Sequence, residues 1–309
     1  MEIEQELASI NPQGETLLTL GVFDGVHAGH RYLLEKLKQR AAKKNLLSGV
    51  VTFNPHPQSV LHPYNQLPWL SDVEDRVRSI QELGISIVAV LTFTPKIAQL
   101  SARDFMSLLK KHLKIHGIMV GPDFALGQDR EGDINLLRTL GREMNFSVEA
   151  IPPYTINGEI VSSTLIRQAL IQGNMKRIKK LMGHYFYLSG NVITSDRRGR
   201  VLGFPTANLD IKPQQALPRN GIYATIAQVD SVQLPSATNI GIRPTFGKGI
   251  KTVEAHLLDY EGDLYGKEIR LEFVQKLRDE QRFPSAEELK VQIEKDVHRV
   301  KTLLAKDLK

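Results

Sequence analysis

Residues 21–30, Gly-Val-Phe-Asp-Gly-Val-His-Ala-Gly-His, decide the fold of the first half of the chain. The apolar run Leu17–Phe23, which leads into them, predicts a buried strand. A helical pattern begins at about Gly29 and carries leucines on one face. The stretch therefore predicts a strand, a glycine-rich turn and the start of a helix, as in the first unit of a parallel sheet.

Three glycines and two histidines give this turn its chemistry. Gly21, Gly25 and Gly29 allow the backbone to approach a ligand closely. His27 and His30 are three residues apart, so one turn of helix places both imidazoles on the same side. The unpaired N–H groups at a helix N-terminus favour an anion. The turn is therefore expected to bind phosphate and to stabilise the charge that develops during its transfer.

Two other interpretations of the histidines are open at this point. His27 and His30 could supply half of a zinc site with His56 as a third ligand, although no glutamate base or further ligand completes that pattern. They could also be purely structural. The glycines around them favour the phosphate interpretation over both alternatives.

The rest of the first half alternates between strand and helix patterns. Strands are expected at 50–53, 85–93 and 117–121, and helices from a capping box at 71–74, from Ser101 and over 133–144. Strands separated by helices indicate βαβ units, so we expect a Rossmann-like α/β domain with a parallel sheet covered on both faces.

The pattern changes near residue 184. Short β-like runs follow at 185–193, 222–229, 252–258 and 269–273. Several short strands at close spacing predict an antiparallel β-barrel or sandwich. A capping box at 285–288 then begins a long terminal helix. We therefore expect an α/β domain over residues 1–183 and a β domain over residues 184–309.

Composition excludes several classes of protein. The 309 residues suit two domains of ordinary size. The chain has no cysteine, which excludes disulfide scaffolds, thiolate zinc sites and cysteine nucleophiles. No apolar run approaches the roughly 20 residues of a membrane span, and the first six residues are acidic rather than signal-like. We therefore expect a cytoplasmic protein with no membrane partner.

The net charge of +6 and the pI near 9.3 suit either nucleic acid or a small phosphorylated ligand. The densest basic cluster is 196–200, and the other basic residues are dispersed. A nucleic-acid surface would need a clustered basic face with interleaved aromatic residues, which make up only 6% of the chain. The small anionic ligand is therefore favoured, and no nucleic-acid partner is expected.

Two later segments fit the same phosphate site. Residues 121–127 carry Asp123, whose carboxylate could reach a nucleotide or its magnesium, or could simply form a turn. Residues 162–167 begin a helix with three hydroxyl residues, which are usually N-caps, followed by Arg167. Hydroxyls, backbone N–H groups and a guanidinium together make a polyphosphate clamp.

Residues 27–30 resemble the His-x-Gly-His signature of the nucleotidyltransferase superfamily, which includes class I aminoacyl-tRNA synthetases. With the segments 121–127 and 162–167, they resemble the FMN adenylyltransferase module of prokaryotic FAD synthetases. The resemblance implies that His27 and His30 are catalytic. The ATP-binding residues that it implies are Gly21, Phe23, Gly25, Gly29, Asp123, Ser163, Thr164 and Arg167. The chain departs from the usual family pattern at Val22, Leu126 and Gln128.

Residues 203–208, Gly-Phe-Pro-Thr-Ala-Asn, are the most specific string in the second half. Gly203 and Pro205 fix a tight backbone path, and Thr206 and Asn208 offer the hard oxygen ligands that magnesium prefers. The same side chains could instead cap backbone groups where a turn enters a strand.

This string resembles the PTAN motif of riboflavin kinases, and the likeness extends over the second domain. The resemblance implies that Gly203, Pro205, Thr206 and Asn208 bind ATP in the kinase domain, the last two through Mg²⁺. It also implies that Glu254 takes the proton from the 5′-hydroxyl of the flavin's ribityl chain, although a lone glutamate in a strand most often faces solvent.

Two further residues lie in segments that resemble the riboflavin kinase family. Arg278 and Phe283 are expected to contact the flavin. Ser195 stands near a position where the family often has glycine, in the loop before the PTAN-like string.

Taken together, the chain resembles the prokaryotic bifunctional riboflavin kinase/FMN adenylyltransferase (FAD synthetase) family. The resemblance implies that the second domain phosphorylates riboflavin to FMN with MgATP and that the first joins FMN to AMP from a second ATP, giving FAD and pyrophosphate. The expected ligands are therefore riboflavin, FMN, FAD, ATP and Mg²⁺.

Two rival functions are an adenylyltransferase of the same superfamily with another phosphorylated substrate and an RNA-binding protein derived from a synthetase. The PTAN-like domain argues against the first, and the dispersed basic residues argue against the second. The sequence leaves the oligomeric state open, a homo-oligomer included.

Overall fold

The structure, a computed structural model, describes residues 3–64, 67–194, 203–243 and 250–305. By the contacts between residues, the chain divides into two compact units, Met1–Ser163 and Thr164–Lys309. Ser195 and the basic cluster at 196–200 lie outside the described residues. Within the described ranges, no helix is long and apolar enough to cross a membrane.

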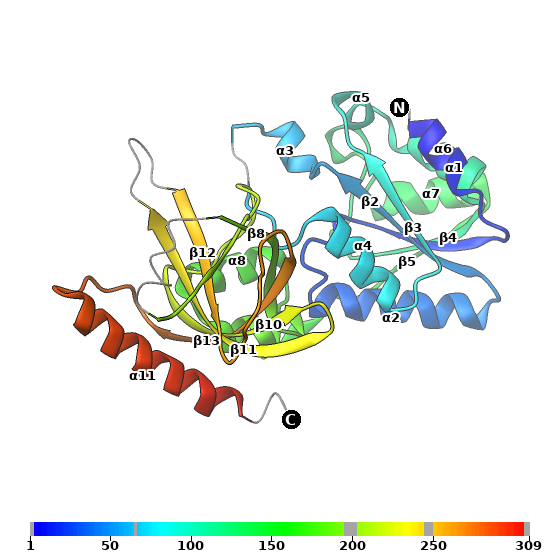
Figure 1. Cartoon of the computed structure of the whole chain (residues 1–309). Helices are drawn as coiled ribbons and strands as arrows, with labels where there is room; N and C mark the ends of the chain where they lie inside the picture. Colours follow the sequence, from blue (N-terminus) through cyan, green and yellow to red (C-terminus); the bar gives the residue numbers. More distant parts are fainter. Residues whose placement is uncertain (1–2, 65–66, 195–202, 244–249, 306–309) are drawn as a thin grey trace. The chain divides into compact units, whose positions relative to one another are not determined.

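The first unit is built on a parallel sheet of five strands in the order β3-β2-β1-β4-β5, which confirms the expected α/β fold (Figure 1). The strands are β1 (Thr16–Leu20), β2 (Leu47–Asn54), β3 (Ile87–Thr92), β4 (Ile115–Val120) and β5 (Ser147–Ala150). The helices are α1 (Ile3–Ile10), α2 (Ala28–Lys43), α3 (Pro57–Leu61), α4 (Val73–Glu82), α5 (Pro95–Ala98), α6 (Ala102–Leu113) and α7 (Ile134–Met144). A short 3₁₀ turn, η1 (Gln128–Arg130), and the small hairpin β6 (Thr155–Ile156) with β7 (Glu159–Ile160) complete the unit.

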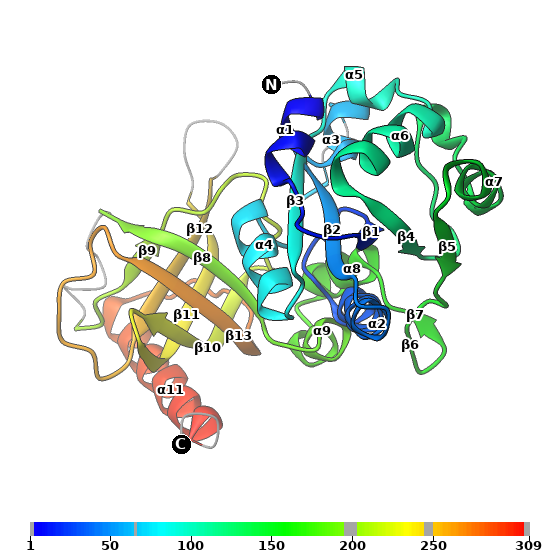
Figure 2. The same cartoon turned by 90° about the vertical axis from the view of Figure 1, so that its right-hand side faces the viewer.

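Helices cover both faces of this sheet, as the alternating pattern predicts. The helices α1, α6 and α7 pack on one face, where Leu18 and Ile118 join a core with Leu7 and Met106. The helices α2 and α4 pack on the other face around Leu17, Val50 and Met119. Figure 2 shows α2 and α6 on opposite sides of the sheet. Because β1 lies in the middle of the sheet, the turn that follows it emerges at the centre of the strands' carboxyl ends.

Side chains with local sequence signals cap two helices of this unit. The Ser101 side chain caps α6, as expected, and Asp133, which was expected to lie in the helical stretch 133–144, instead caps α7. The predicted capping box at 71–74 begins one residue too early, because Asp72 rather than Ser71 caps α4. The Ser71 hydroxyl instead accepts a hydrogen bond from the Gly25 N–H at 2.9 Å.

The second unit contains a closed antiparallel barrel with the strand order β10-β11-β12-β9-β8-β13. Its elements are α8 (Ser163–Gln172), α9 (Met175–Met182), β8 (Phe186–Ile193), β9 (Ala207–Leu209), β10 (Gly221–Val229), β11 (Val232–Arg243), β12 (Ile250–Leu257), β13 (Glu268–Arg278) and α11 (Ala286–Leu304). The expected barrel is therefore confirmed, while β9 and β11 were not among the predicted strands.

The two faces of the barrel wall have different partners. Tyr223, Phe186 and Phe273 are buried and pack ring against ring. Ala224 and Leu277 belong instead to a cluster with Val300 of α11, which lies along the barrel in Figure 1. The Ser285 side chain caps α11 by accepting from the Glu288 N–H, as the sequence predicts.

Candidate active sites

The turn between β1 and α2 brings the two predicted histidines together. His27 is the N-cap of α2, and its Nδ1 accepts a hydrogen bond from the backbone N–H of His30 at 3.3 Å. The two imidazole rings stack with their centroids 3.6 Å apart and an interplanar angle of 15°. Because Nδ1 of His27 is an acceptor, the proton of its neutral ring lies on Nε2, which can donate to an anion.

His30 is held as a neutral imidazole when the site is empty. Burial lowers the pKa of His30 well below its usual value, and the neighbouring His27 and Arg76 side chains lower it further. Its Nδ1 atom is shielded from solvent and has no hydrogen-bond partner among the described residues. A buried nitrogen without a partner is costly, so this atom is suited to meet a ligand.

The glycines of the turn are required by close packing and by backbone conformation. A Cβ on Gly29 would lie 3.2 Å from the His27 ring and 3.2 Å from the Val161 carbonyl oxygen. Gly25 has φ +78°, and a Cβ there would lie 2.9 Å from Cβ of Leu70. Val26, a β-branched residue, also has a positive φ of 37°, an uncommon conformation that marks local strain at the site.

Asp24 fixes this strained turn to the segments around it. Its carboxylate accepts hydrogen bonds from the N–H groups of Leu70 at 2.9 Å and Ser71 at 3.1 Å. Its carbonyl oxygen accepts from the hydroxyl of Ser163 at 3.0 Å. Ser163 was expected to bind phosphate, and the structure places it against the histidine turn. Asp24 itself was not among the predicted site residues.

Arg76 is a second residue that sequence reasoning missed. It lies on α4, is only 6% exposed, and donates from Nη1 to the Val22 carbonyl oxygen at 2.5 Å. Further contacts join the same atom to Thr52 Oγ1 at 3.3 Å and to the Phe53 carbonyl oxygen at 3.4 Å. An arginine in an amphipathic helix normally faces solvent, so the sequence carries no signal for this position.

The other residues predicted for the first site have simpler surroundings. Asp123 is exposed, and its carbonyl oxygen accepts from Arg130 Nη2 at 3.2 Å. Thr164 and Arg167 lie in the first turns of α8, which the contacts group with the second unit. His56 caps α3 by accepting from the Gln58 N–H at 3.1 Å. Among the described residues, no group of three His, Asp or Glu side chains is arranged to hold a metal ion.

In the barrel, three polar residues stand in one row across neighbouring strands. The register places Asn208 of β9 opposite Glu254 of β12, and Glu254 opposite Asn239 of β11. Directly opposed residues of antiparallel strands project from the same face, so the three side chains lie side by side. Val253 and Ala255, the neighbours of Glu254, are buried on the other face, as the alternation predicts.

Asn239 is a further residue that sequence reasoning missed. Its Oδ1 atom is buried and has no hydrogen-bond partner in the part of the chain that the structure describes. An asparagine inside a strand run gives no functional signal by itself, and only the register reveals that it is the neighbour of Glu254. The unpartnered oxygen makes this row a candidate polar site rather than an ordinary sheet surface.

Thr206 and Pro205 line a cavity of about 580 Å³. Tyr260 and Tyr265 line it as well, and Pro205 is fixed by a 2.8 Å contact between its carbonyl oxygen and His256 Nδ1. The exposed Thr206 hydroxyl and the Asn208 amide, two residues apart, are hard oxygen donors of the kind that suits Mg²⁺.

The predicted flavin residues lie where β13 meets α11. Arg278 makes a bidentate ion pair with the buried Asp296 of α11, with Nη2 and Oδ2 2.8 Å apart. The Arg278 guanidinium also lies 5.7 Å from the ring centroid of Phe283. Nε and Nη2 of Arg278 hold α11 through Asp296, and Nη1 donates to the Asp279 carbonyl oxygen at 3.1 Å, so the planar face of the guanidinium is left for contact with a ring.

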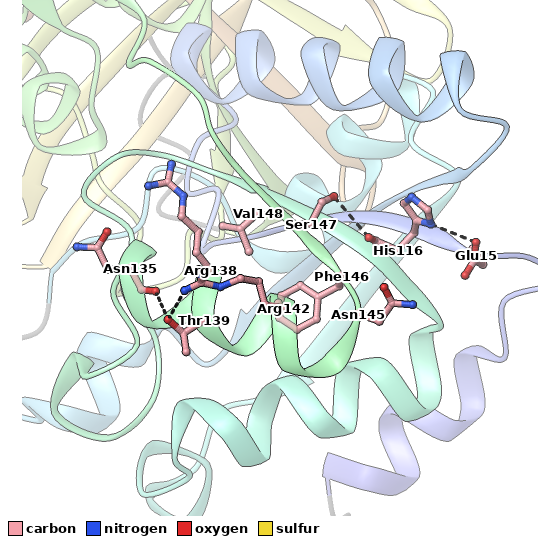
Figure 3. A pocket seen from close by; sticks show the side chains of 11 residues that line it. Glu15, His116, Asn135, Arg138, Thr139, Arg142, Asn145, Phe146, Ser147 and Val148 are labelled. Atoms are coloured by element: carbon pink, nitrogen blue, oxygen red, sulfur yellow. Dashed lines mark hydrogen bonds and ion pairs between the residues drawn. The ribbon is translucent and has the colours of Figure 1, made fainter.

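A larger cavity of about 920 Å³ lies at the opposite, amino ends of the strands in the first unit (Figure 3). His116 and Ser147 line it, and Arg142 on α7 donates to Thr139 Oγ1 at 3.2 Å. None of the predicted site residues is among the described residues that line it. Size alone therefore does not locate the candidate sites.

Comparisons with known proteins match both parts of the chain. The FAD synthetase family model matches residues 9–165, and the riboflavin kinase model matches residues 182–304. A bifunctional riboflavin kinase/FMN adenylyltransferase from Escherichia coli (strain K12) is 40% identical over 92% of this chain and 91% of its own length. The protein of that name from Pseudomonas fluorescens is 36% identical over 99% of this chain and 98% of its own.

A solved structure supports the fold over nearly the full length. The crystal structure of a protein named macrolide-efflux protein, from Streptococcus pneumoniae, matches with a TM-score of 0.88 and 27% identity over 97% of both chains. The two family models match in the order expected from the two motifs, and the relatives cover almost the entire chain. The chain therefore belongs to the family of bifunctional riboflavin kinases/FMN adenylyltransferases.

Proposed function

We propose that the β1–α2 turn is the FMN adenylyltransferase site. The observation that carries this proposal is the stacked His27–His30 pair at the N-terminus of α2, with glycines that bring backbone close to a ligand. The FMN phosphate attacks the α-phosphorus of ATP, a new P–O–P bond forms, and the bond to pyrophosphate breaks. This transfer needs placed donors rather than a protein nucleophile.

Each residue of this site has one task in the proposal. The His27 Nε2–H donates to the oxygens around the α-phosphorus, and His30 meets the same negative charge through its unpartnered Nδ1. Ser163, Thr164 and Arg167 hold the departing pyrophosphate. Gly21, Phe23, Gly25, Gly29 and Asp123 complete the proposed ATP contacts.

We propose that the barrel phosphorylates riboflavin. Glu254 accepts the proton of the ribityl 5′-hydroxyl as that oxygen attacks the γ-phosphorus of ATP, and ADP leaves. Thr206 and Asn208 would hold Mg²⁺, which neutralises charge on the phosphates when bound. Gly203 and Pro205 shape the ATP loop, and Arg278 and Phe283 contact the flavin. The half-buried position of Glu254 in a row of polar residues supports this assignment.

We further propose that the catalytic domains span residues 1–183 and 184–309, and that the protein works in the cytoplasm without nucleic acid. The contacts between residues divide the chain earlier, between Ser163 and Thr164, because they group α8 and α9 with the second unit. Whether copies of the chain assemble into a homo-oligomer is a matter for sedimentation measurements.

One assay tests both activities together. Purified protein is incubated with riboflavin, ATP and MgCl₂, and the flavins are separated by chromatography. The proposal predicts FMN followed by FAD, and FAD directly when FMN replaces riboflavin. Failure of FMN to be consumed would contradict the first site, and failure of riboflavin to be consumed would contradict the second.

A further inference from the structure

A buried arginine, Arg76, contacts the backbone of the histidine turn. Arg76 is 6% exposed, and its Nε atom is shielded from solvent without a hydrogen-bond partner in the described ranges. Placing a charged group in the interior is costly, and leaving one of its donors unpaired adds to the cost. A residue kept at such a cost calls for a reason beyond packing.

Arg76 connects three backbone segments at the carboxyl ends of the strands. Its Nη1 donates to the Val22 carbonyl oxygen, which also accepts from Thr52 Oγ1 at 3.0 Å. The same Nη1 lies 3.4 Å from the Phe53 carbonyl oxygen at the end of β2. The turn after β1 is therefore tied to β2 and to α4 through one guanidinium.

The segment that Arg76 holds also contacts the His27–His30 pair. Val22 precedes Phe23, which has a positive φ of 55° and whose ring lies 5.0 Å from the His30 ring, centroid to centroid. Asp24, next along the turn, is held by the N–H groups just before α4. Arg76 and the N–H groups of Leu70 and Ser71 thus hold the strained backbone whose Phe23 ring contacts the His30 ring.

We propose that Arg76 is a positioning residue of the adenylyltransferase site, which fixes the β1–α2 turn through Val22 and presents a buried positive charge beside His30. This inference rests on the proposed function of that site.

The positive charge of Arg76 affects the protonation of His30. His30 faces His27 and Arg76, while Arg76 itself faces Asp24, Asp72 and Glu74. Burial lowers the pKa of His30 most, His27 and then Arg76 lower it further, and without ATP the imidazole is therefore neutral. The negative charge of a bound triphosphate opposes the effect of Arg76 and raises the pKa of His30.

The direct test is the titration of His30 by NMR in the full-length chain labelled with ¹⁵N-histidine. The His30 signals are assigned by their loss in His30→Gln. In the wild-type protein, His30 stays neutral to well below pH 6.5, and α,β-methylene-ATP raises its titration midpoint. Arg76→Met raises the midpoint without ligand by about one pH unit, the order expected for a nearby charge. Arg76→Lys keeps the charge and leaves the midpoint low.

Kinetics separate the two roles of the guanidinium. Arg76→Lys loses the fork that reaches Val22 and lowers kcat for FAD formation from FMN by roughly 10-fold, because a displaced turn misplaces the histidines. Arg76→Met loses more, roughly 100-fold, and shifts the pH profile of kcat. Riboflavin phosphorylation by the same chain is unchanged in both variants and serves as the internal control.

The proposal is overturned if wild-type His30 titrates near pH 6.5 in the empty protein, or if Arg76→Met leaves both this midpoint and FAD formation unchanged. Should Arg76→Met fail to fold, Arg76→Lys still decides, because it keeps the charge but loses the fork that reaches Val22: an unchanged kcat for FAD formation overturns the proposal. If the wild-type protein makes no FAD from FMN, the proposed function fails, whereas the coupling of Arg76 to His30 is judged from the titration alone.

Discussion

At the scale of single residues, Gly29 gives the sharpest steric test of the histidine turn. A methyl group in Gly29→Ala would press on the His27 ring and the Val161 carbonyl oxygen, both 3.2 Å from the added Cβ. We expect FAD formation from FMN to fall by roughly 10- to 100-fold, since a small displacement of a catalytic group has such effects. Gly14→Ala, where the new Cβ meets only Leu47 at 3.9 Å, is the matched control and should leave the rate unchanged.

Glu254 is tested by removing its basicity while keeping its shape. Glu254→Gln retains a side chain of the same size in the row with Asn208 and Asn239. We expect FMN formation from riboflavin to fall roughly 100-fold or more, as for loss of a general base, while FMN is still converted to FAD. Both rates are read from one chromatographic assay. An equal loss of the two activities would show that Glu254 has a structural role instead.

These residues also show how far a sequence can lead. The proposed role of His27 and His30 follows from the local spacing of a motif, whereas that of Glu254 follows only from the resemblance to riboflavin kinases. Arg76 and Asn239 carry no such signal, because each becomes part of a site only through a tertiary neighbour. For Arg76 that neighbour is Val22, which lies 54 residues earlier in the chain. For Asn239 it is Glu254, which lies opposite it on the neighbouring strand β12.

At the scale of elements, the ion pair between Arg278 and Asp296 is expected to hold α11 against the barrel. The Asp296→Asn substitution removes the charge of a buried partner and leaves the Arg278 guanidinium poorly paired. We expect the second unit to lose about 2 kcal/mol of its free energy of unfolding, the order of a hydrogen-bonded charge pair. Urea unfolding of the wild type and the variant measures this loss. The exposed pair Lys301–Asp259 provides the control, because Asp259→Asn should change stability by less than about 1 kcal/mol.

The start of α2 is expected to make the first unit sensitive to acid. Because the pKa of His30 is lower in the folded protein than in the unfolded chain, the unfolded state binds more protons as the pH falls. Stability therefore decreases as the pH drops below about 6.5, the ordinary histidine value. Urea midpoints between pH 7.5 and 5 should fall less steeply for His30→Gln than for the wild type. Identical slopes would show that His30 is not held neutral by the fold.

Elements with strong local signals were predictable, and those without them were not. The N-caps of α6 and α11 follow from Ser101 and Ser285. The twelve-residue strand β11 was missed because Pro235 and Gly241 interrupt its pattern, although the barrel supplies partners on both sides. The parallel sheet was predictable because strands that alternate with helices run parallel, whereas the strand order β3-β2-β1-β4-β5 was not predicted.

At the scale of the whole molecule, one ATP-dependent reaction belongs to each of the two parts that the family models match, residues 9–165 and residues 182–304. The family models match the two parts separately, and the motif residues of each part have their own supporting contacts. No thiol takes part, since the chain has no cysteine. The two reactions share FMN, the product of one and the substrate of the other, so each can be measured without the other by choice of starting flavin.

The double substitution of His27 and His30 by alanine tests this division most directly. Riboflavin or FMN is supplied with ATP and MgCl₂, and the rates of FMN and FAD formation are compared with those of the wild type. The account predicts that FAD formation is lost, while riboflavin is still converted to FMN at the wild-type rate. FAD synthesis that survives the double substitution would contradict the assignment of the adenylyltransferase site to the β1–α2 turn.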